Sequence, residues 1–302
     1  MSITLDIASI LTVNYLNAWS HLSKTFDRLY VAQTVLDVFG AHVAKVESFA
    51  SNGFMSLAFE DGKFVRTEIS KEVIDKNIQR TQSIMQMVRE NFEIMPLSPD
   101  IIPALLQSSG DDFADRNSLA TLSVPQQTNS ILYSDDLRLK VIGERVFGVQ
   151  GFWTQPLLSV LQEVGQITQE DCFELLAKLL VAHYYFTAIN PKLLIYLFKK
   201  NNLHLTLEIK EALKTLHGPH ATEPDVVRIV SECLRQIWME MWPFEQKIFV
   251  LDLCLKAAIT NRQANFVLDK VSRRLHLRLY LDQLHHDQIL TEIRNWRHVN
   301  GC

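Results

Sequence analysis

The sequence predicts an α/β fold, a parallel sheet flanked by helices, followed by an all-helical C-terminal region. In the first half of the chain, short β-prone runs alternate with segments whose apolar residues recur at helical spacing, which is typical of a parallel sheet. From Thr154 onward the pattern is helical to the end of the chain. We therefore divide the chain into an α/β domain over residues 1–155 and a helical extension over residues 156–302.

The first 50 residues predict the order strand, helix, strand, helix. Residues 3–7 form a short buried strand that contains Asp6, and residues 8–22 follow with apolar residues at helical spacing. Residues 28–32 are the second strand. Thr34, whose hydroxyl can accept a backbone hydrogen bond, is predicted to cap a helix over residues 35–49.

Residues 50–110 break this alternation and are predicted to form an insertion. Two β-prone runs, 54–59 and 64–69, flank Asp61-Gly62, and an Asp-Gly pair between such runs is a strong hairpin signal. A long amphipathic helix is expected over residues 70–92. Three prolines then indicate a connector: Pro96, Pro99 and Pro103.

The α/β pattern resumes at Asp115, where a helix is expected to run to Leu122. A buried strand over residues 130–133 and a helix over residues 137–145 follow, and residues 147–153 are the last predicted strand. The helical extension is interrupted at moderately regular intervals, which fits stacked helical hairpins without a recognisable sequence repeat. The interruptions are at Gly165, Pro191, Gly218, Pro224 and Pro243.

Composition excludes several classes of protein. Apolar residues make up 47% of the chain and charged residues 21%, which are ordinary values for a globular protein. No run is long and apolar enough for a membrane span, and the N-terminus lacks the basic start of a secretory signal. The four widely spaced cysteines predict buried free thiols, and His217 with His220 offers no second ligand pair for zinc. The formal charge of −4 does not point to a nucleic-acid binder, but it does not exclude one whose carboxylates are offset by bound cations.

Three aspartates fall where strands and helices of the predicted sheet meet. Asp6 ends the first strand, Asp115 opens a helix, and Asp136 follows the strand at residues 130–133. Residues just beyond the carboxyl ends of parallel strands converge at one edge of the sheet. Carboxylates gathered there repel one another unless a cation neutralises them, and oxygen ligands favour Mg²⁺ or Mn²⁺ over zinc. Each acid also has an ordinary alternative role as a turn or helix-capping residue.

The order of these motifs resembles the PIN-domain nuclease family over about residues 1–155. The likeness is carried by Leu5-Asp6, by Phe113-Ala114-Asp115, and by Ser134-Asp135-Asp136 followed by a helix with a leucine-rich face. Residues 30–36 are similar to the family's second strand entering its second helix. The resemblance implies a metal-dependent endoribonuclease that hydrolyses phosphodiesters and leaves 5′-phosphate and 3′-hydroxyl ends.

The resemblance also implies roles for individual residues. Asp6 and Asp136 are expected as the primary ligands of Mg²⁺ or Mn²⁺, with Asp115 as a further ligand and Asp135 as an outer base or support. Ser9 and Ser134 are expected to hydrogen-bond the ligating carboxylates. Apart from the resemblance, Arg138 and Lys140, on the helix after Asp136, are candidate contacts to a phosphate backbone, and a solvated helix face explains them equally well. Tyr133 and Trp153 are candidate stacking partners for bases, although aromatic residues at strand ends more often belong to the core.

One position departs from the family pattern. The family places a Glu early in its second helix, whereas the matched position here is Val38, preceded by Asp37. Either Asp37 or Glu47 substitutes, or the fourth acid is absent. A degenerate, non-catalytic PIN scaffold or RNA-binding module therefore stays open as the alternative, and so does a nuclease acting on DNA or structured flaps.

The resemblance implies a cytoplasmic protein that acts on RNA, with single-stranded RNA favoured. A regulatory protein partner or antitoxin is a further expectation, in a toxin–antitoxin, RNA-maturation or antiviral-defence setting. No membrane partner is expected. These expectations rest on analogy with the family, since a fold does not by itself fix a function.

Overall fold

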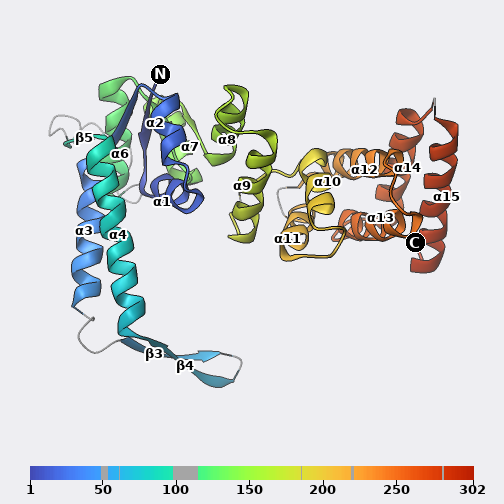
Figure 1. Cartoon of the computed structure of the whole chain (residues 1–302), viewed down its shortest axis with the longest axis horizontal. Helices are drawn as coiled ribbons and strands as arrows, with labels where there is room; N and C mark the ends of the chain where they lie inside the picture. Colours follow the sequence, from blue (N-terminus) through green and yellow to red (C-terminus); the bar gives the residue numbers. More distant parts are fainter. Residues whose placement is uncertain (49–53, 61, 98–114, 185, 219–220, 281) are drawn as a thin grey trace. The chain divides into compact units, whose positions relative to one another are not determined.

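The predicted alternation of strands and helices is confirmed in a computed structural model of the chain (Figure 1), which describes residues 1–48, 54–60, 62–97, 115–184, 186–218, 221–280 and 282–302. The chain divides into two compact units, Met1–Gln166 and Ile167–Cys302. Among the described helices, none combines the length and apolar character needed to span a membrane.

Five short strands form a parallel sheet in the first unit, in the order β5-β2-β1-β6-β7. Central strand β1 pairs with β2 on one side and with β6 on the other, so that Leu5 lies opposite Val31 and Tyr133. These three side chains are fully buried, as expected for a parallel sheet that is covered on both faces. The strands span Ser2–Leu5 (β1), Arg28–Ala32 (β2), Glu93–Met95 (β5), Ile131–Tyr133 (β6) and Gly151–Phe152 (β7).

Seven described helices accompany the sheet. Helix α6 packs across β1, β2 and β6, while α7 packs on α6 and β7. Their contact encloses a core cluster of Leu122, Leu132, Leu139, Ile142 and Val149. The helices span Ile7–Leu16 (α1), Trp19–Thr25 (α2), Gln33–Glu47 (α3), Lys71–Asn91 (α4), Arg116–Thr128 (α6), Leu137–Phe147 (α7) and Thr154–Glu163 (α8).

Local differences from the predicted elements have physical causes. The helix predicted over residues 8–22 is broken at Asn17, which adopts the left-handed conformation (φ 56°) that Asn tolerates better than most residues. The predicted cap at Thr34 is wrong, because α3 begins two residues earlier with Ala32 at the N-cap. The Thr34 hydroxyl instead donates to Asn117 Oδ1 at 2.8 Å. Strand β5, which falls within the predicted insertion, pairs with β2 and so belongs to the sheet.

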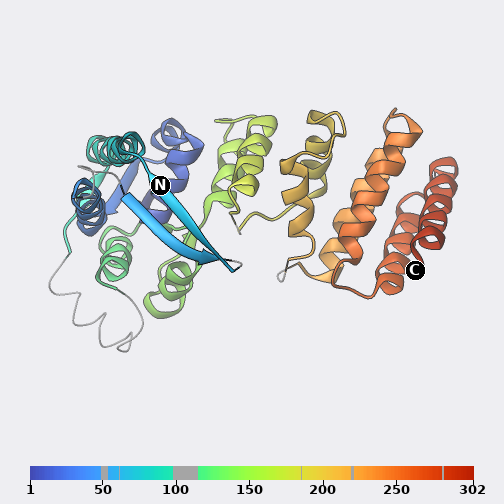
Figure 2. The ribbon, with the colours of Figure 1, turned by 90° about the horizontal axis from the view of Figure 1, so that it is seen from below.

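The predicted hairpin is confirmed as the antiparallel pair β3 (Phe54–Glu60) and β4 (Lys63–Ile69). Its turn contains Gly62 at φ +77°, a conformation that glycine adopts without strain. Helices α3 and α4 lie side by side, and the hairpin lies at the end of this pair that is distant from the sheet (Figures 1 and 2). Residues 98–114, with Pro99 and Pro103 of the predicted connector, lie outside the described residues.

The second unit is helical throughout its described residues, as predicted. Helix α12 packs against α10, α13 and α14, and the helices lie side by side along the unit (Figure 2). All four cysteines are free thiols, as predicted, and three of them, Cys172, Cys233 and Cys254, are buried, whereas Cys302 is partly exposed. The helices span Gln169–Val181 (α9), Pro191–Lys200 (α10), Leu207–Thr215 (α11), Glu223–Met239 (α12), Phe244–Ile259 (α13), Ala264–Arg278 (α14) and Gln283–Asn300 (α15).

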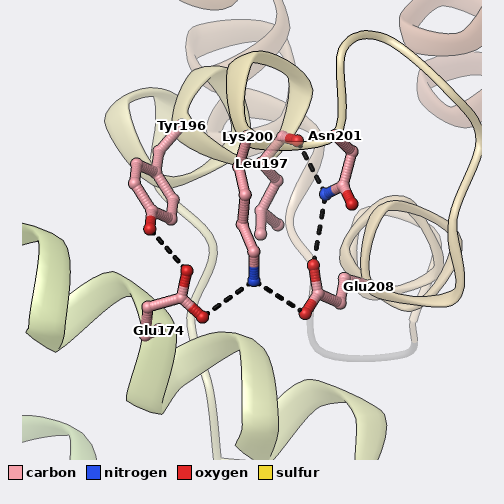
Figure 3. Close-up of polar contacts among 6 residues, drawn as sticks. All are labelled: Glu174, Tyr196, Leu197, Lys200, Asn201 and Glu208. Carbon is pink, nitrogen blue, oxygen red and sulfur yellow. Dashed lines mark hydrogen bonds and ion pairs between the residues drawn. The ribbon is translucent and has the colours of Figure 1, made fainter.

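A polar network centred on Lys200 joins α9, α10 and α11 (Figure 3). The Lys200 ammonium donates to Glu174 at 2.7 Å and to Glu208 at 3.0 Å. The Tyr196 hydroxyl donates to the other oxygen of Glu174, and the Asn201 amide donates to Glu208. Burial and the bonded Glu174 carboxylate raise the pKa of Tyr196. The network fixes these three helices in one register.

Candidate active site at the carboxyl edge of the sheet

The carboxyl ends of β1 and β6 meet at the point where the strand order reverses. The chain passes from β1 to β2 on one side and later returns to β6 on the other side. In open parallel sheets, the crevice outside such a switch point is the usual place for a site. Asp6 directly follows β1, and Ser134, Asp135 and Asp136 directly follow β6. The sequence therefore brings these residues to one edge.

Asp6 is a buried carboxylate held by donors from helix α1 and from the residue that follows β6. It is 4% exposed and caps α1, with Oδ1 accepting from the Ser9 backbone N–H at 2.7 Å. Its Oδ2 accepts from the Ser134 hydroxyl at 2.6 Å. Burial raises the pKa of the Asp6 carboxyl above its ordinary value of 3.8, against the lowering effect of these hydrogen bonds, and the neighbouring charge of Asp135 raises it further. A charge in this position is costly unless a cation neutralises it.

Ser9 and Ser134 support this carboxylate as predicted from the sequence. The Ser9 hydroxyl accepts from the Asp6 backbone N–H and lies 2.9 Å from the Tyr133 carbonyl oxygen, to which it donates. Besides binding Asp6, the Ser134 hydroxyl accepts from the Asp136 backbone N–H at 3.1 Å. Ser134 thus links the end of β1 to the start of α7.

Asp136 and Asp115 are exposed helix N-caps. Asp136 Oδ1 accepts from the backbone N–H groups of Arg138 and Leu139 at the start of α7. Asp115 Oδ1 accepts from the Ser118 backbone N–H at the start of α6. These bonds use Oδ1 of each carboxylate. Oδ2 of each accepts no hydrogen bond from the part of the chain that the structure describes. Both the capping role and a free ligating oxygen are present.

The start of α6 lies at the same edge as the strand ends. Helix α6 ends just before β6 begins and packs against the sheet, so its first turn is directed toward the carboxyl edge. The hydrogen bond from Thr34, two residues beyond β2, to Asn117 in the first turn of α6 joins these two positions directly. Neither Thr34 nor Asn117 was singled out for this contact from the sequence.

Residues 4–144 match the family model described as "PIN domain associated with the TPR-GreAB-C-PIN system". This part of the chain is a PIN domain. PIN domains are a nuclease superfamily and generally use divalent metals. No curated protein and no solved structure matches the chain.

The PIN domain positions Asp135 differently from the other acids. This side chain is buried, and its two oxygens accept from the backbone N–H and the hydroxyl of Thr154, at 2.9 and 2.6 Å. Asp135 therefore accepts hydrogen bonds at the start of α8, and it lies close enough to Asp6 for its charge to contribute to the raised pKa of the Asp6 carboxyl. Thr154 was not identified from the sequence as part of this edge. The sequence feature that could have pointed to Thr154 is the position of its hydroxyl directly after a predicted strand.

The remaining sequence-predicted residues of the PIN domain lie on or near its surface. Asp37 is exposed and accepts from the Gln33 amide, and the side chain of Val38 is 42% exposed. Arg138 is exposed, whereas Lys140 pairs with Glu144 at 2.7 Å. Their contact with nucleic acid stays a prediction.

Of the two roles considered for Tyr133, the structure supports the core role and not stacking on bases. Its side chain is fully buried, its hydroxyl hydrogen-bonds Thr154, and its ring stacks on Phe152 at a centroid distance of 5.1 Å. Trp153 is partly buried, with the Lys140 ammonium 5.2 Å from its ring centroid. An aromatic ring at a strand end has here become part of the core.

The donor chemistry of this edge suits a hard divalent cation, because carboxylate oxygens are the ligands that Mg²⁺ and Mn²⁺ prefer. Among the residues that the structure describes, however, no group of three or more His, Cys, Asp or Glu side chains is placed to hold a metal ion. Asp6 and Asp136, linked through Ser134, are the best supported pair of the predicted ligands. The three-carboxylate set with Asp115 stays a prediction.

Proposed function

We propose that the PIN domain is an endoribonuclease that depends on Mg²⁺ or Mn²⁺ and cuts RNA at the carboxyl edge between β1 and β6. Asp6 and Asp136 are the proposed primary ligands, and Asp115 is a further ligand. The observation that carries the proposal is the burial of the Asp6 carboxylate at the end of the central strand, with Ser134 linking it to Asp136. Capping of α1 uses one oxygen of this carboxylate, and burying its charge is costly unless a cation compensates it.

The protein's own groups prepare this edge for phosphodiester hydrolysis. Ser9 and Ser134 hold Asp6 in one orientation, and backbone N–H groups in the first turns of α1 and α7 donate to Asp6 and Asp136. Asp135 fixes the start of α8 beside them. A bound divalent cation supplies the activation of water and the stabilisation of charge on the phosphate oxygens.

The test is cleavage of fluorescent single-stranded RNA by the purified full chain with Mg²⁺, with Mn²⁺, or with EDTA. We expect cleavage with either cation, none with EDTA, and a loss on the order of 100-fold or more in Asp136→Asn. Asp75→Asn on α4, which also removes one carboxylate charge from the PIN domain, is the matched control and should cut at the wild-type rate. Equal cleavage by Asp136→Asn and Asp75→Asn would show that another site or a contaminant is responsible.

A non-catalytic PIN scaffold that binds RNA is the second candidate. It is favoured by the incomplete carboxylate set among the described residues and by Val38 at the position where the family places a Glu. RNA binding without cutting in any divalent cation would establish it. Single-stranded DNA and flap substrates in the same assay separate an RNA-specific enzyme from a DNA or structure-specific nuclease.

The family description associates this type of PIN domain with a TPR-GreAB-C-PIN system. On this basis we propose that a protein partner regulates the nuclease of this chain. An antitoxin is one form that such a partner could take. Cytoplasmic location and a role as an effector or in antiviral defence are further parts of this proposal. They are tested by isolating the complex from cells and assaying RNA cleavage before and after the partner is removed.

A further inference from the structure

One helix of the second unit, α14, carries more positive charge than the helices that pack against it. Residues 1–166 contain 13 Lys and Arg against 19 Asp and Glu, whereas residues 167–302 contain 17 against 15. Residues 264–280, which cover α14, contain four basic residues against one acidic residue. A helix with this excess differs from its neighbours and requires an explanation beyond a solvated surface.

Two arginines of α14, Arg273 and Arg274, have no acidic partner within the described structure, whereas Arg278 acts electrostatically on the nearby carboxylate of Glu232. Elsewhere in the unit, basic side chains commonly form ion pairs, as Lys200 does with Glu174. In the described part of the chain, Arg273, Arg274 and Arg278 make neither an ion pair nor a hydrogen bond through their guanidinium groups. The acid on this helix, Asp269, is already paired with Arg297. Attraction to the helix C-terminus explains Arg278, in the last turn, but not Arg273 and Arg274.

Exposed aromatic and aliphatic side chains flank these charges on the same side of the helix. The opposite side, including Val267, Leu268, Val271 and Leu275, is buried against the unit. The exposed fractions are 49% for Phe266, 70% for Leu277 and 74% for Tyr280. We define the α14 face by five side chains on the helix and one just beyond its C-cap: Phe266, Lys270, Arg273, Arg274 and Leu277, with Tyr280. Within it, Lys270 is paired with Glu223 at 2.6 Å and lies 3.9 Å from the centroid of the Phe266 ring. From Phe266 to Leu277 the face extends roughly 17 Å, from a rise of about 1.5 Å per residue.

We propose that the α14 face binds single-stranded RNA. The unpaired guanidinium groups would contact backbone phosphates, and Tyr280 and Phe266 would stack on bases at the two ends of the face. Charge complementarity selects a polyanion, and exposed aromatic rings at both ends select one whose bases are unpaired. The proposal names a substrate-binding surface for the proposed nuclease and rests on that function for its biological purpose, although binding itself does not require cleavage.

Binding is measured with the full chain in EDTA, by the fluorescence anisotropy of a short fluorescein-labelled oligouridine over a salt series. Arg273→Glu/Arg274→Glu is compared with Lys192→Glu/Lys210→Glu, which makes the same charge change at exposed lysines of α10 and α11. If the arginine variant loses two phosphate contacts, the slope of log affinity against log salt should become smaller in magnitude by about 1.4. Raising the salt from about 50 to 200 mM should then weaken RNA binding roughly 7-fold less in this variant than in the wild type. The control should keep the wild-type slope. Equal slopes in the two variants would overturn the proposal.

Stacking is tested at Tyr280. We expect Tyr280→Ala to weaken binding on the order of 5- to 100-fold, and Tyr280→Phe to retain affinity, because the ring and not the hydroxyl supports stacking. Unchanged binding by Tyr280→Ala would refute the stacking role. If the arginine variant kept its RNA affinity but lost binding to an acidic polypeptide such as polyglutamate, the face would belong to an acidic protein partner and the proposal would be wrong.

The two proposals fail separately. Asp136→Asn is expected to bind oligouridine in EDTA as the wild type does, because this residue lies in the first unit. Binding through the α14 face without cleavage in any cation would leave this inference standing while the nuclease proposal fails. Cleavage that requires Asp136, with RNA binding insensitive to the α14 variants, would give the opposite result.

Discussion

Replacing Ser134 with alanine tests how the carboxylate of Asp6 is maintained. The hydroxyl donates to Asp6 Oδ2 at 2.6 Å in a buried setting, and a hydrogen bond to a charged group contributes about 1.5–3 kcal/mol. Ser134→Ala should therefore lower the free energy of unfolding by about 2 kcal/mol at neutral pH. For a unit of this size, that loss corresponds to a Tm lower by roughly 4–8 °C.

The destabilisation caused by Ser134→Ala should depend on pH in a defined direction. Because burial raises the pKa of Asp6 above 3.8, the folded protein binds this proton more tightly than the unfolded chain does. Stability from Asp6 is thus fully present below pH 3.8 and is lost as the pH rises through the folded pKa. Removing a donor to the ionised carboxylate raises that pKa further. The cost of Ser134→Ala should therefore be small in acid and reach its full value once Asp6 is ionised.

The assay is thermal unfolding followed by circular dichroism across a pH series from acid to neutral. Ser123→Ala is the control, because the buried Ser123 hydroxyl donates at 2.7 Å to a neutral acceptor, the Ala120 carbonyl oxygen. Its cost of about 1 kcal/mol should not change with pH. If the Tm difference between wild type and Ser134→Ala were constant over the series, the role assigned to the Asp6 charge would be wrong.

Two further changes test contacts of each unit. Asp135→Ala leaves the backbone N–H of Thr154 without its acceptor at the start of α8 and should cost about 2 kcal/mol in urea unfolding; a change below a few tenths would mean that this cap is replaceable. Lys200→Met should cost about 1 kcal/mol, reduced by partial solvent exposure. Burial raises the pKa of Glu174, but its hydrogen bonds and the nearby positive charges, led by the hydrogen bond from Lys200, together outweigh this effect, and the pKa of the carboxyl lies below its ordinary value of 4.5. The stability that this pair contributes in the wild type is therefore present above pH 4.5 and is lost as the pH falls through the pKa of the folded state. Unfolding free energies measured from pH 7 down to pH 3 should fall less steeply in Lys200→Met, and a parallel fall in both proteins would contradict the pairing.

Much of the fold was predictable because its signals are local. Short runs such as Arg28–Ala32 stand between helical patterns, and Asp61-Gly62 lies between two β-prone runs, so β1, β2, β6 and the hairpin were found near their observed bounds. Strand β5 was missed, and the strand predicted over residues 147–153 is only Gly151–Phe152. The start of α3 was misplaced because Thr34 has the right chemistry for a cap, yet packing directs its hydroxyl to Asn117 instead. A hydrogen-bond partner 83 residues away in the sequence cannot be predicted from the local pattern of residues.

The candidate site was predictable in position and less so in detail. Asp6, Ser134 and Asp136 meet because strand ends of a parallel sheet converge, which depends only on topology. Whether their oxygens also surround a cation depends on side-chain geometry that topology does not fix. The acids proved to be helix caps as well as candidate ligands, since the same carboxylate can accept backbone N–H groups with one oxygen. Tyr133 shows the same limit, because its burial followed from packing against Phe152.

The pairing of β1 leaves the N-terminus of this protein little freedom to change in length. Strand β1 has four residues, and Leu5 must face both Val31 and Tyr133 for Asp6 to meet the hydroxyl of Ser134. Since side chains alternate across a strand, a deletion or insertion of a single residue between Ser2 and Leu5 would exchange the side chains that β1 buries on the two faces of the sheet or carry Asp6 away from its partner. The spacing from Ser2 to Asp6 should therefore be left as it is when the protein is engineered.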